Sequence, residues 1–219
     1  MIAGGLASCG GHKLEVHPLA AKHQKPEPPQ KLYLDAQDLL DDSFRLAADI
    51  YASGFRPSFI IAVWRGGAPI GLAVQEFLSH LGVESDHIAI RTSSYYPGID
   101  QRARKVAVHG LNYLVKNLKF EDELLIVDDV FDTGHTIAAI LDELRSKLRR
   151  NMPEDTRIAV PYYKPTRNET ELAPDYCIHE TTRWLKYPQS LEGLTRAEIA
   201  EHRPEIYSII KDRLPASFE

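Results

Sequence analysis

The stretch that most constrains the fold of this chain is Leu124–Thr136, which reads LLIVDDVFDTGHT. It begins with an apolar run of strand length, which predicts a strand buried on both faces. Such strands are typical of parallel sheets covered by helices on each side. Asp128 and Asp129 end this strand, and the carboxyl ends of parallel strands are where such sheets bind ligands. We therefore expect an α/β fold with a ligand site at this acidic pair.

The residues after the acidic pair predict an anion-binding turn. The chain turns through Asp132, Thr133 and Gly134 into an expected helix, whose first N–H groups lack partners within the helix and point outward. Gly134 permits the backbone conformation and the close approach that a bound phosphate requires. Thr133 and Thr136 add hydroxyl donors. Two carboxylates beside a phosphate-binding turn favour a phosphorylated sugar as ligand, with a hydrated Mg²⁺ held by the pair.

Three other protein classes share part of this pattern. Aspartic proteases carry Asp-Thr-Gly on β-hairpins, not between a buried strand and a helix. P-loop NTPases need G-x-x-x-x-G-K-[ST], which this sequence does not contain. Haloacid-dehalogenase phosphatases need two Asp two positions apart followed by Gly-Thr, whereas Asp129 and Asp132 are three apart. A plain acidic strand end with a helix N-cap would leave the cluster of acids and turn residues unexplained.

Strand and helix patterns alternate from residue 35 to residue 163. Asp35 is an expected N-cap of the first helix, and further strands are expected at 59–64, 88–92 and 157–163. This alternation predicts the α/β class, with a mostly parallel central sheet flanked by helices. We divide the chain into a flexible N-terminal arm (1–30), a core (31–165) with an exposed lid loop (93–110), and a small C-terminal hood with a helical extension (166–219).

Composition excludes several functions. The net charge is −5, which argues against a nucleic-acid partner because such proteins need a basic surface. No apolar run approaches the roughly 18 residues of a membrane span, and the N-terminus lacks the features of a signal peptide. Two cysteines, Cys9 and Cys177, are too few for a disulfide framework. We expect a cytoplasmic protein without a membrane or nucleic-acid partner.

The stretch LLIVDDVFDTGHT resembles the phosphoribosyl-pyrophosphate signature of the type I phosphoribosyltransferases. Other segments resemble further parts of the purine members of that family, in the same order along the chain. These are IIAVWRGG (60–67), SSYYPG (93–98), YYKP (162–165) and DYCIHETTRWLKYP (175–188). The resemblance covers roughly residues 35–188 and is strongest to the bacterial xanthine-guanine enzymes. It implies the type I phosphoribosyltransferase fold with a C-terminal hood.

The resemblance also implies a reaction. A purine base and phosphoribosyl pyrophosphate would give a nucleoside monophosphate and pyrophosphate, in purine salvage, with Mg²⁺ as cofactor. The base would be a 6-oxopurine: xanthine, guanine or hypoxanthine. A phosphoribosyltransferase for another base, or a non-catalytic sensor of phosphoribosyl pyrophosphate, are the alternatives. Members of the family are commonly dimers or tetramers, so a homodimer or homotetramer is expected.

Residue roles follow from the same resemblance. The acidic pair, Asp128 and Asp129, would hold the ribose hydroxyls and, through water, the metal ion. Asp132 would be the general acid/base near the purine N7, or an N-cap of the next helix, or both. Two groups of residues would bind phosphoribosyl pyrophosphate beside the acidic pair: Thr133, Gly134, His135 and Thr136 at the 5′-phosphate, and Arg65, Gly66 and Gly67 at the pyrophosphate, in a loop where the family often has a cis peptide.

The base and the lid complete the expected site. Lys164 is either a solvated lysine or the donor to the purine O6, and Trp184 is either a core residue or the ring that stacks on the base. Leu185 would offer backbone groups to the base edge. Ser94 and Tyr95 would lead the movement of the lid over pyrophosphate. His135 would contribute its N–H group and keep its ring at the rim of the site.

Overall fold

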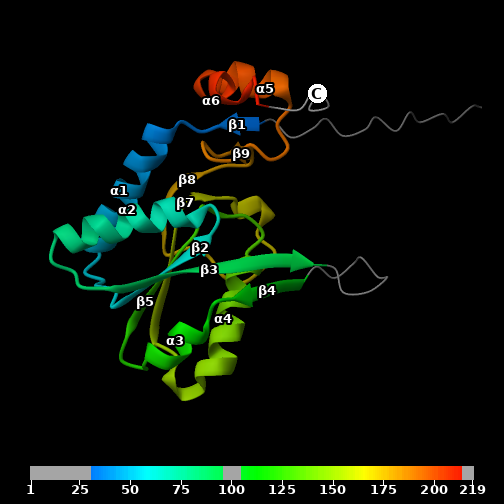
Figure 1. Cartoon of the computed structure of the whole chain (residues 1–219). Coiled ribbons are helices and arrows are strands. Elements are labelled where there is room, and N and C mark those ends of the chain that lie inside the picture. The colour runs from blue at the N-terminus through cyan, green and yellow to red at the C-terminus, as the bar shows by residue number, and fades with distance from the viewer. Residues whose placement is uncertain (1–30, 96–104, 214–219) are drawn as a thin grey trace, which may run out of the picture.

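The structure, a computed structural model, describes residues 31–95 and 105–213. A seven-stranded sheet crosses its centre (Figure 1). In spatial order its strands are β4 (Lys105–His109), β3 (Asp86–Tyr95), β2 (Phe59–Trp64), β5 (Glu123–Val127), β7 (Asp155–Tyr163) and β6 (Val130–Phe131), with β8 (Tyr176–Glu180) also paired to β7. Every pairing is parallel except that of β3 with β4. The expected α/β class with a mostly parallel sheet is confirmed.

Helices cover both faces of this sheet, as the apolar central strands predict. Helices α1 (Ala36–Ala52) and α2 (Gly67–His80) pack on one face, and α3 (Asn112–Asn117) and α4 (His135–Leu148) on the other. Alternate residues of β5 divide between the two cores: Leu125 faces α1 and α2, whereas Leu124 and Ile126 face α3 and α4. Short 3₁₀ turns follow α4 (η1, Arg149–Asn151) and β7 (η2, Pro165–Arg167).

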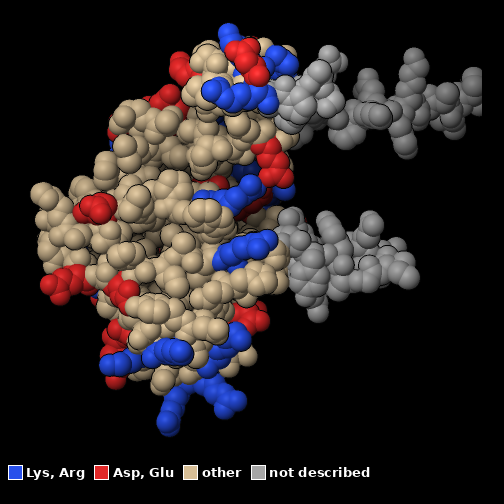
Figure 2. Space-filling model, viewed as in Figure 1, with Lys and Arg blue, Asp and Glu red and all other residues tan. Residues whose placement is uncertain are grey.

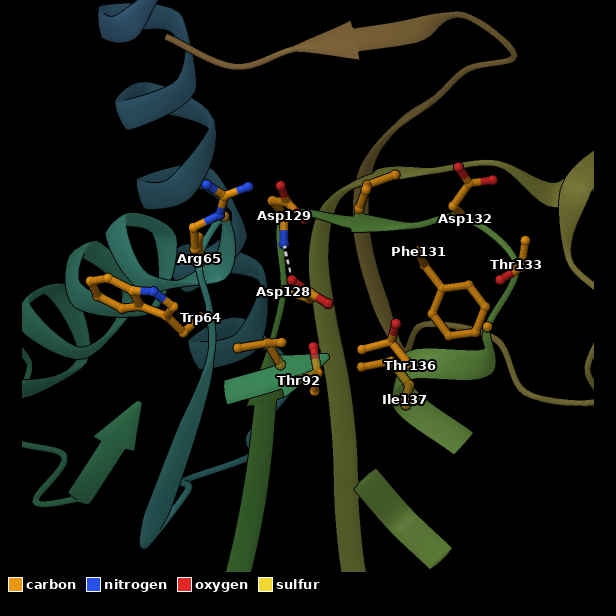
Figure 3. Close-up of a pocket in the computed structure, with 14 residues that line it drawn as sticks. Trp64, Arg65, Thr92, Asp128, Asp129, Phe131, Asp132, Thr133, Thr136 and Ile137 are labelled. Atoms are coloured by element: carbon orange, nitrogen blue, oxygen red, sulfur yellow. Dashed lines mark hydrogen bonds between the residues drawn. The ribbon is translucent and has the colours of Figure 1, made fainter. Parts of the chain in front are cut away.

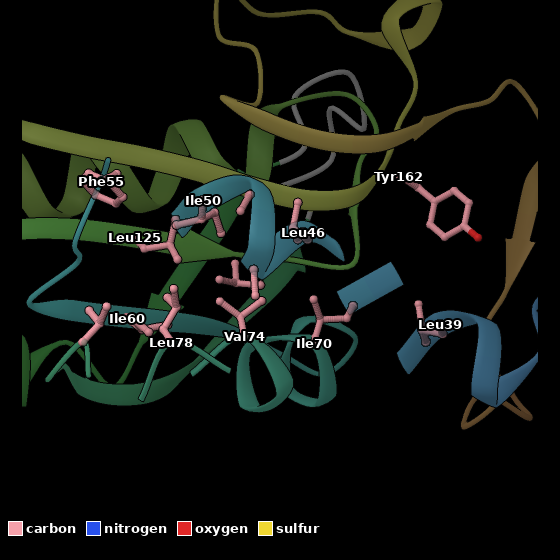
Figure 4. Packing of buried hydrophobic residues seen from close by; sticks show 14 of the residues in the cluster. Leu39, Leu46, Ile50, Phe55, Ile60, Ile70, Val74, Leu78, Leu125 and Tyr162 are labelled. Carbon is pink, nitrogen blue, oxygen red and sulfur yellow. The ribbon is translucent and has the colours of Figure 1, made fainter. Parts of the chain in front are cut away.

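The core beneath α1 and α2 fixes the position of β2 and β5. Leu46 and Ile50 of α1 are fully buried against Ile60, Ile70 and neighbouring side chains (Figure 4). Burying one such aliphatic side chain contributes about 1.5–3 kcal/mol. The expected N-cap of α1 is confirmed, because the Asp35 carboxylate accepts from the N–H groups of the second and third helical residues. The rigid face formed in this way supports the strand ends at which the site lies.

A second, smaller unit covers one end of the sheet (Figure 1). We call it the hood: strands β1 (Lys31–Tyr33) and β9 (Trp184–Lys186), paired in parallel, with helices α5 (Arg196–His202) and α6 (Pro204–Ile210). Arg203 joins its parts by donating to the backbone oxygens of Leu34, at 3.0 Å, and Lys186. Residues 31–33 therefore lie with the hood, and β8 lies in the central sheet. The expected arm, 1–30, lies outside the described residues.

The expected lid loop over 93–110 is corrected at both ends. β3 continues to Tyr95, and β4 already begins at Lys105, in an antiparallel hairpin. Pairing between the two strands satisfies their backbone groups, which a reading of side-chain polarity alone does not reveal. Residues 96–104 lie outside the described residues. Among the described helices, none is long and apolar enough to span a membrane.

Candidate functional site

The acidic pair sits where β5 ends, at the carboxyl edge of the sheet. Asp128 is 8% exposed, and its Oδ1 accepts from the N–H of Asp129 at 2.9 Å (Figure 3). Burial, reinforced by the neighbouring Asp129 charge, raises the pKa of the Asp128 carboxyl well above its usual range. Burial also raises the pKa of the Asp129 carboxyl. Two adjacent carboxyls, one buried and one half-buried, whose pKa values are both raised, form a site that favours a cation or several hydroxyl donors.

The loop after β2 lies against the acidic pair. Its peptide bond between Trp64 and Arg65 is cis. A Cβ added to Gly67 would lie 2.6 Å from the Val127 carbonyl oxygen and 2.8 Å from the Asp128 Cα. One added to Gly66 would overlap the Asp129 carboxylate. Glycine at both positions is therefore what allows this loop to approach the acids.

The Arg65 side chain lies partly outside this arrangement. Its Nη2 is 2.6 Å from Glu192 Oε2, in a pair whose side chains are about three-quarters exposed. Arg65 nonetheless borders two neighbouring cavities of about 250 and 240 Å³. Gly66 and Asp129 also line both cavities. The first cavity lies over the acidic pair. The second opens toward residues 187–192, beyond β9.

The turn between β6 and α4 has the backbone expected of an anion-binding turn. Gly134 has φ +83° and directly precedes α4, and the helix start has no side-chain cap. N–H groups at this 14-residue helix start therefore remain available, with the helix dipole adding positive character. Thr133, Gly134 and Thr136 line the cavity above the acidic pair (Figure 3). The His135 ring instead pairs with Glu169, with 2.7 Å between Nε2 and Oε2, and is about half exposed.

The Asp132 carboxylate is engaged elsewhere, so its predicted role as N-cap of α4 is wrong. Gly134 takes the cap position. Asp132 Oδ2 lies 3.0 Å from Lys164 Nζ, and Oδ1 lies 2.7 Å from Arg167 Nε. The two cations attract the side chain away from the helix start.

Lys164 and Trp184 meet although 20 residues separate them. The Lys164 side chain is only 4% exposed, and its Nζ lies 5.6 Å from the centre of the Trp184 ring. A buried lysine is rare unless it is paired, so the reading of Lys164 as a solvated side chain is wrong. Trp184 is 43% exposed, so it is not a core residue. Leu185 is buried in β9, which leaves only its backbone to face a ligand.

Three residues near the site were not among the binding or catalytic residues predicted from the sequence. Tyr187, which is buried, donates from its hydroxyl to the Asp129 carbonyl oxygen at 2.8 Å, and burial raises its pKa well above the usual range. Arg167 pairs with Asp132, as described, and Thr92 borders the first cavity. Of the expected lid residues, Ser94 and Tyr95 belong to β3. The sequence offered two weak indications of these residues: Arg167 lies three residues after Lys164, and Tyr187 directly follows β9.

The acidic pair suits a weakly chelated metal ion. No group of three or more His, Cys, Asp or Glu able to hold a metal occurs among residues 31–95 and 105–213. Mg²⁺ keeps several waters and is commonly bound by one or two carboxylates together with substrate phosphates. The donor set of Asp128 and Asp129 therefore fits Mg²⁺ delivered with a phosphorylated ligand, whereas it lacks the ligands of a structural metal site.

Basic and acidic side chains are interspersed on the visible face of the molecule (Figure 2). A group of basic side chains gathers at the lower end of the view, where α4 ends in Figure 1, and Arg145 and Lys147 lie in the last turn of that helix. Cations at a helix C-terminus are favoured by the helix dipole. This basic group is therefore explained by the helix it belongs to.

Comparisons with known proteins agree with this geometry. The model of the phosphoribosyl transferase domain matches residues 29–192. No curated protein matches the chain. A purine phosphoribosyltransferase from Pyrococcus horikoshii is 25% identical, with TM-score 0.58, over 75% of this chain and 97% of that one. A hypothetical protein from Neisseria gonorrhoeae, with bound ppGpp, is 21% identical, with TM-score 0.65, over 83% and 98%. The xanthine-guanine-hypoxanthine phosphoribosyltransferase of Helicobacter pylori is 19% identical, with TM-score 0.54, over 72% and 92%.

Proposed function

Because this chain belongs to the phosphoribosyltransferase family, we propose that it transfers the 5-phosphoribosyl group of phosphoribosyl pyrophosphate to N9 of a 6-oxopurine. The products are a nucleoside monophosphate and pyrophosphate, and the bases are xanthine, guanine or hypoxanthine. The bond from C1′ of the sugar to the pyrophosphate oxygen breaks, and a bond from C1′ to N9 forms. The pyrophosphate leaves with the electron pair of the broken bond. The base reacts as the tautomer protonated at N7, so that N9 supplies the electron pair of the new bond and the N7 proton passes to the Asp132 carboxylate.

The observation that carries the choice of base is the buried Lys164 ammonium. Its Nζ lies 3.0 Å from Asp132 and 5.6 Å from the centre of the Trp184 ring. A base stacked on Trp184 meets this donor at the edge that carries the 6-substituent. A carbonyl oxygen at that position accepts from the ammonium, whereas the amino group of adenine places a second donor against an ammonium that needs a further acceptor. A site built on such a hydrogen bond rejects the wrong base by about 10⁴-fold or more.

The acidic pair acts on the sugar. As C1′ loses the leaving group, the ribose takes on positive charge, and preorganised carboxylates beside it stabilise that charge. Asp128 and Asp129 accept from the ribose hydroxyls and hold Mg²⁺ through water. When bound, Mg²⁺ neutralises charge that develops on pyrophosphate. Asp132 faces the base and accepts or returns a proton at N7, with Lys164 beside it.

The two loops divide the phosphates between them. The turn of Thr133–Thr136 binds the 5′-phosphate through backbone N–H groups and two hydroxyls. Gly66 and Gly67 bring backbone donors to the pyrophosphate. Arg65 joins them once it exchanges Glu192 for a phosphate oxygen, a small cost because an exposed ion pair contributes only about 0–1 kcal/mol. Ser94 and Tyr95, at the end of β3, complete the proposed set of residues that bind phosphoribosyl pyrophosphate.

A homodimer or homotetramer is part of the proposal. Leu40 and Phe44, one turn apart on α1, and Leu72 of α2 are 41%, 37% and 63% exposed, and these apolar side chains support contact with a second copy. Light scattering that finds a monomer at micromolar concentration would contradict this part alone.

Pyrophosphate release tests the function. The full chain is mixed with Mg²⁺ and phosphoribosyl pyrophosphate, and xanthine, guanine, hypoxanthine, adenine, uracil and orotate are assayed in parallel. We expect turnover with one or more 6-oxopurines and none with adenine. Turnover with a pyrimidine alone would retain the phosphate site and overturn the base pocket. Binding of phosphoribosyl pyrophosphate without turnover of any base would favour a sensor instead.

A further inference from the structure

Four consecutive residues after β7 contact four consecutive residues that lead from β6 into the first residue of α4. We call Arg167–Thr170 the support turn and Asp132–His135 the phosphate turn. Each residue of the phosphate turn meets the support turn through a side chain or a backbone group. More than 30 residues separate the two segments in sequence. Neither segment is a regular partner of the other in the sheet, so the contacts need their own explanation.

The first contact is at the base end. Arg167 Nε lies 2.7 Å from Asp132 Oδ1, and Lys164 Nζ lies 3.0 Å from the other carboxylate oxygen, Oδ2. The Arg167 side chain is half exposed, and that of Asp132 is 28% exposed. Oδ1 accepts no hydrogen bond within the described residues, so Arg167 acts on it by charge, whereas Oδ2 accepts from Lys164 Nζ. The orientation of the carboxylate therefore depends on two cations, one at each oxygen.

The middle contacts are at the backbone of the phosphate turn. The N–H of Glu169 donates to the Thr133 carbonyl oxygen at 3.0 Å. A Cβ at Gly134 would lie 2.3 Å from Thr170 Oγ1 and 3.0 Å from Asn168 Oδ1. The support turn thus packs directly on the one residue of the phosphate turn that has φ +83°. This packing leaves no space into which the phosphate turn could move toward the support turn.

The support turn is itself anchored. Asn168 Oδ1 accepts from both the N–H and the hydroxyl of Thr170, each at 2.9 Å, and its Nδ2 donates to the Leu172 carbonyl oxygen at 2.7 Å. Its Nδ2 also donates to the Tyr163 hydroxyl, at 3.3 Å, at the end of β7. The last contact is the His135–Glu169 pair, which ties the first residue of α4 to the same turn. Asn168 therefore ties the support turn to the end of β7.

We propose that the support turn positions both ends of the substrate: Arg167 orients the Asp132 carboxylate toward the base, and Asn168–Thr170 hold Thr133–His135 in the conformation that binds the 5′-phosphate. The role given to Arg167 rests on the proposed function, because it needs a base beside Asp132. The role given to Asn168–Thr170 requires only that the phosphate turn binds a phosphate monoester. Anion-binding turns gain affinity when their N–H groups are already aligned, because no ordering cost is paid on binding.

Calorimetric titration with ribose 5-phosphate tests the phosphate end without any turnover. Asn168→Ala removes the anchor, and we expect the dissociation constant of ribose 5-phosphate to rise about tenfold. Asn168→Asp keeps the acceptor for Thr170, but it loses the Nδ2 donor and adds a negative charge near the bound phosphate, so we expect a rise of about tenfold or more. Glu171→Ala is the matched control, since Glu171 is exposed and its side chain lies outside these contacts. Circular dichroism and melting confirm that each variant is folded.

Steady-state kinetics with the best 6-oxopurine tests the base end. For Arg167→Ala we expect kcat to fall about tenfold or more, because the reacting carboxylate loses its orientation, with ribose 5-phosphate binding unchanged within twofold. Arg167→Lys keeps the charge and restores most of kcat. Arg150→Ala, an exposed arginine in η1, is the control for charge alone. A merely structural role for the turn would lower all parameters in every folded variant alike.

The outcomes separate this inference from the proposed function. Unchanged ribose 5-phosphate affinity in folded Asn168→Ala overturns the positioning role, whether or not the wild type turns over a base. Equal loss in Glu171→Ala overturns it too. If the wild type binds ribose 5-phosphate but transfers it to no base, the proposed function fails while the Asn168 comparison still decides the role of the turn. If the wild type does not bind ribose 5-phosphate, both fail.

Discussion

Replacing Gly67 by alanine is expected to remove activity while leaving the protein folded. The added Cβ would lie 2.6 Å from the Val127 carbonyl oxygen and 2.8 Å from the Asp128 Cα. The first distance is about 0.8 Å short of ordinary contact, which begins at 3.4 Å. Both neighbours are backbone atoms of the strand end that carries the acidic pair. The loop and this strand end must therefore separate by most of that distance.

Gly67→Ala is expected to lower the stability of the protein only slightly and its catalytic rate strongly. Overpacking of this kind costs about 1–3 kcal/mol. Gly67 is the first residue of α2, and alanine in a helix gains up to about 1 kcal/mol over glycine. The net loss of about 0–2 kcal/mol lowers the melting temperature by up to about 8 °C in a chain of this size. A misplacement near 1 Å at a reacting group can cost about 100-fold in rate, so kcat should fall by about that factor.

The opposite end of the same helix offers a matched control. Gly82 has φ +81°, and a Cβ there would meet nothing within 4 Å. Gly82→Ala is expected to cost about 1–2 kcal/mol through backbone strain and to leave kcat unchanged. Thermal melts and pyrophosphate-release kinetics on both variants are the assays. Activity within threefold of the wild type in Gly67→Ala, or a 100-fold loss in Gly82→Ala, would refute the reasoning.

Three further substitutions probe the site. Asp128→Asn should end turnover yet stabilise the ligand-free protein at pH 8 by about 1 kcal/mol, because it removes a buried carboxylate whose pKa burial raises. The gain should vanish below about pH 4, where the carboxyl is protonated in both folded and unfolded chains; melts from pH 3.5 to 8 that show no such trend would contradict the burial argument. Lys164→Met should raise the KM of the 6-oxopurine at least tenfold and leave that of phosphoribosyl pyrophosphate within twofold; equal changes in both KM values would place Lys164 outside the base pocket. Tyr187→Phe removes the hydroxyl that donates to the Asp129 carbonyl oxygen and should cost about 1 kcal/mol of stability and several-fold in kcat, read by melting and kinetics; a variant identical to the wild type in both would show that this hydrogen bond is dispensable.

The parts of the molecule that local sequence determines were predictable. The Asp35 cap is read from residue type and position and is confirmed. The double-sided burial of β5 follows from its continuous apolar run, because a strand alternates its side chains between two faces. The left-handed conformation at Gly134 is also confirmed, since few other residues adopt it cheaply before a helix.

The parts that depend on distant segments were not predictable from one sequence. The Arg65–Glu192 pair joins residues 127 positions apart, and nothing near either residue indicates the other. The N-cap reading of Asp132 failed because Lys164 and Arg167, which approach only in the folded chain, compete for its carboxylate. The strand β4 was missed because its apolar run, Val106–Val108, is only three residues long and half-buried, and its pairing with β3 is visible only in the folded chain.

A competition between bases in one tube measures directly which base the protein selects. Equal concentrations of xanthine, guanine, hypoxanthine and adenine are incubated with the chain, Mg²⁺ and limiting phosphoribosyl pyrophosphate. The nucleoside monophosphates are then separated and quantified by mass spectrometry. The product ratio reports the ratio of kcat/KM values. We predict one or more 6-oxopurine nucleotides and less than about 1% adenylate, because the buried Lys164 ammonium requires an acceptor at position 6. Adenylate as the main product would contradict the account.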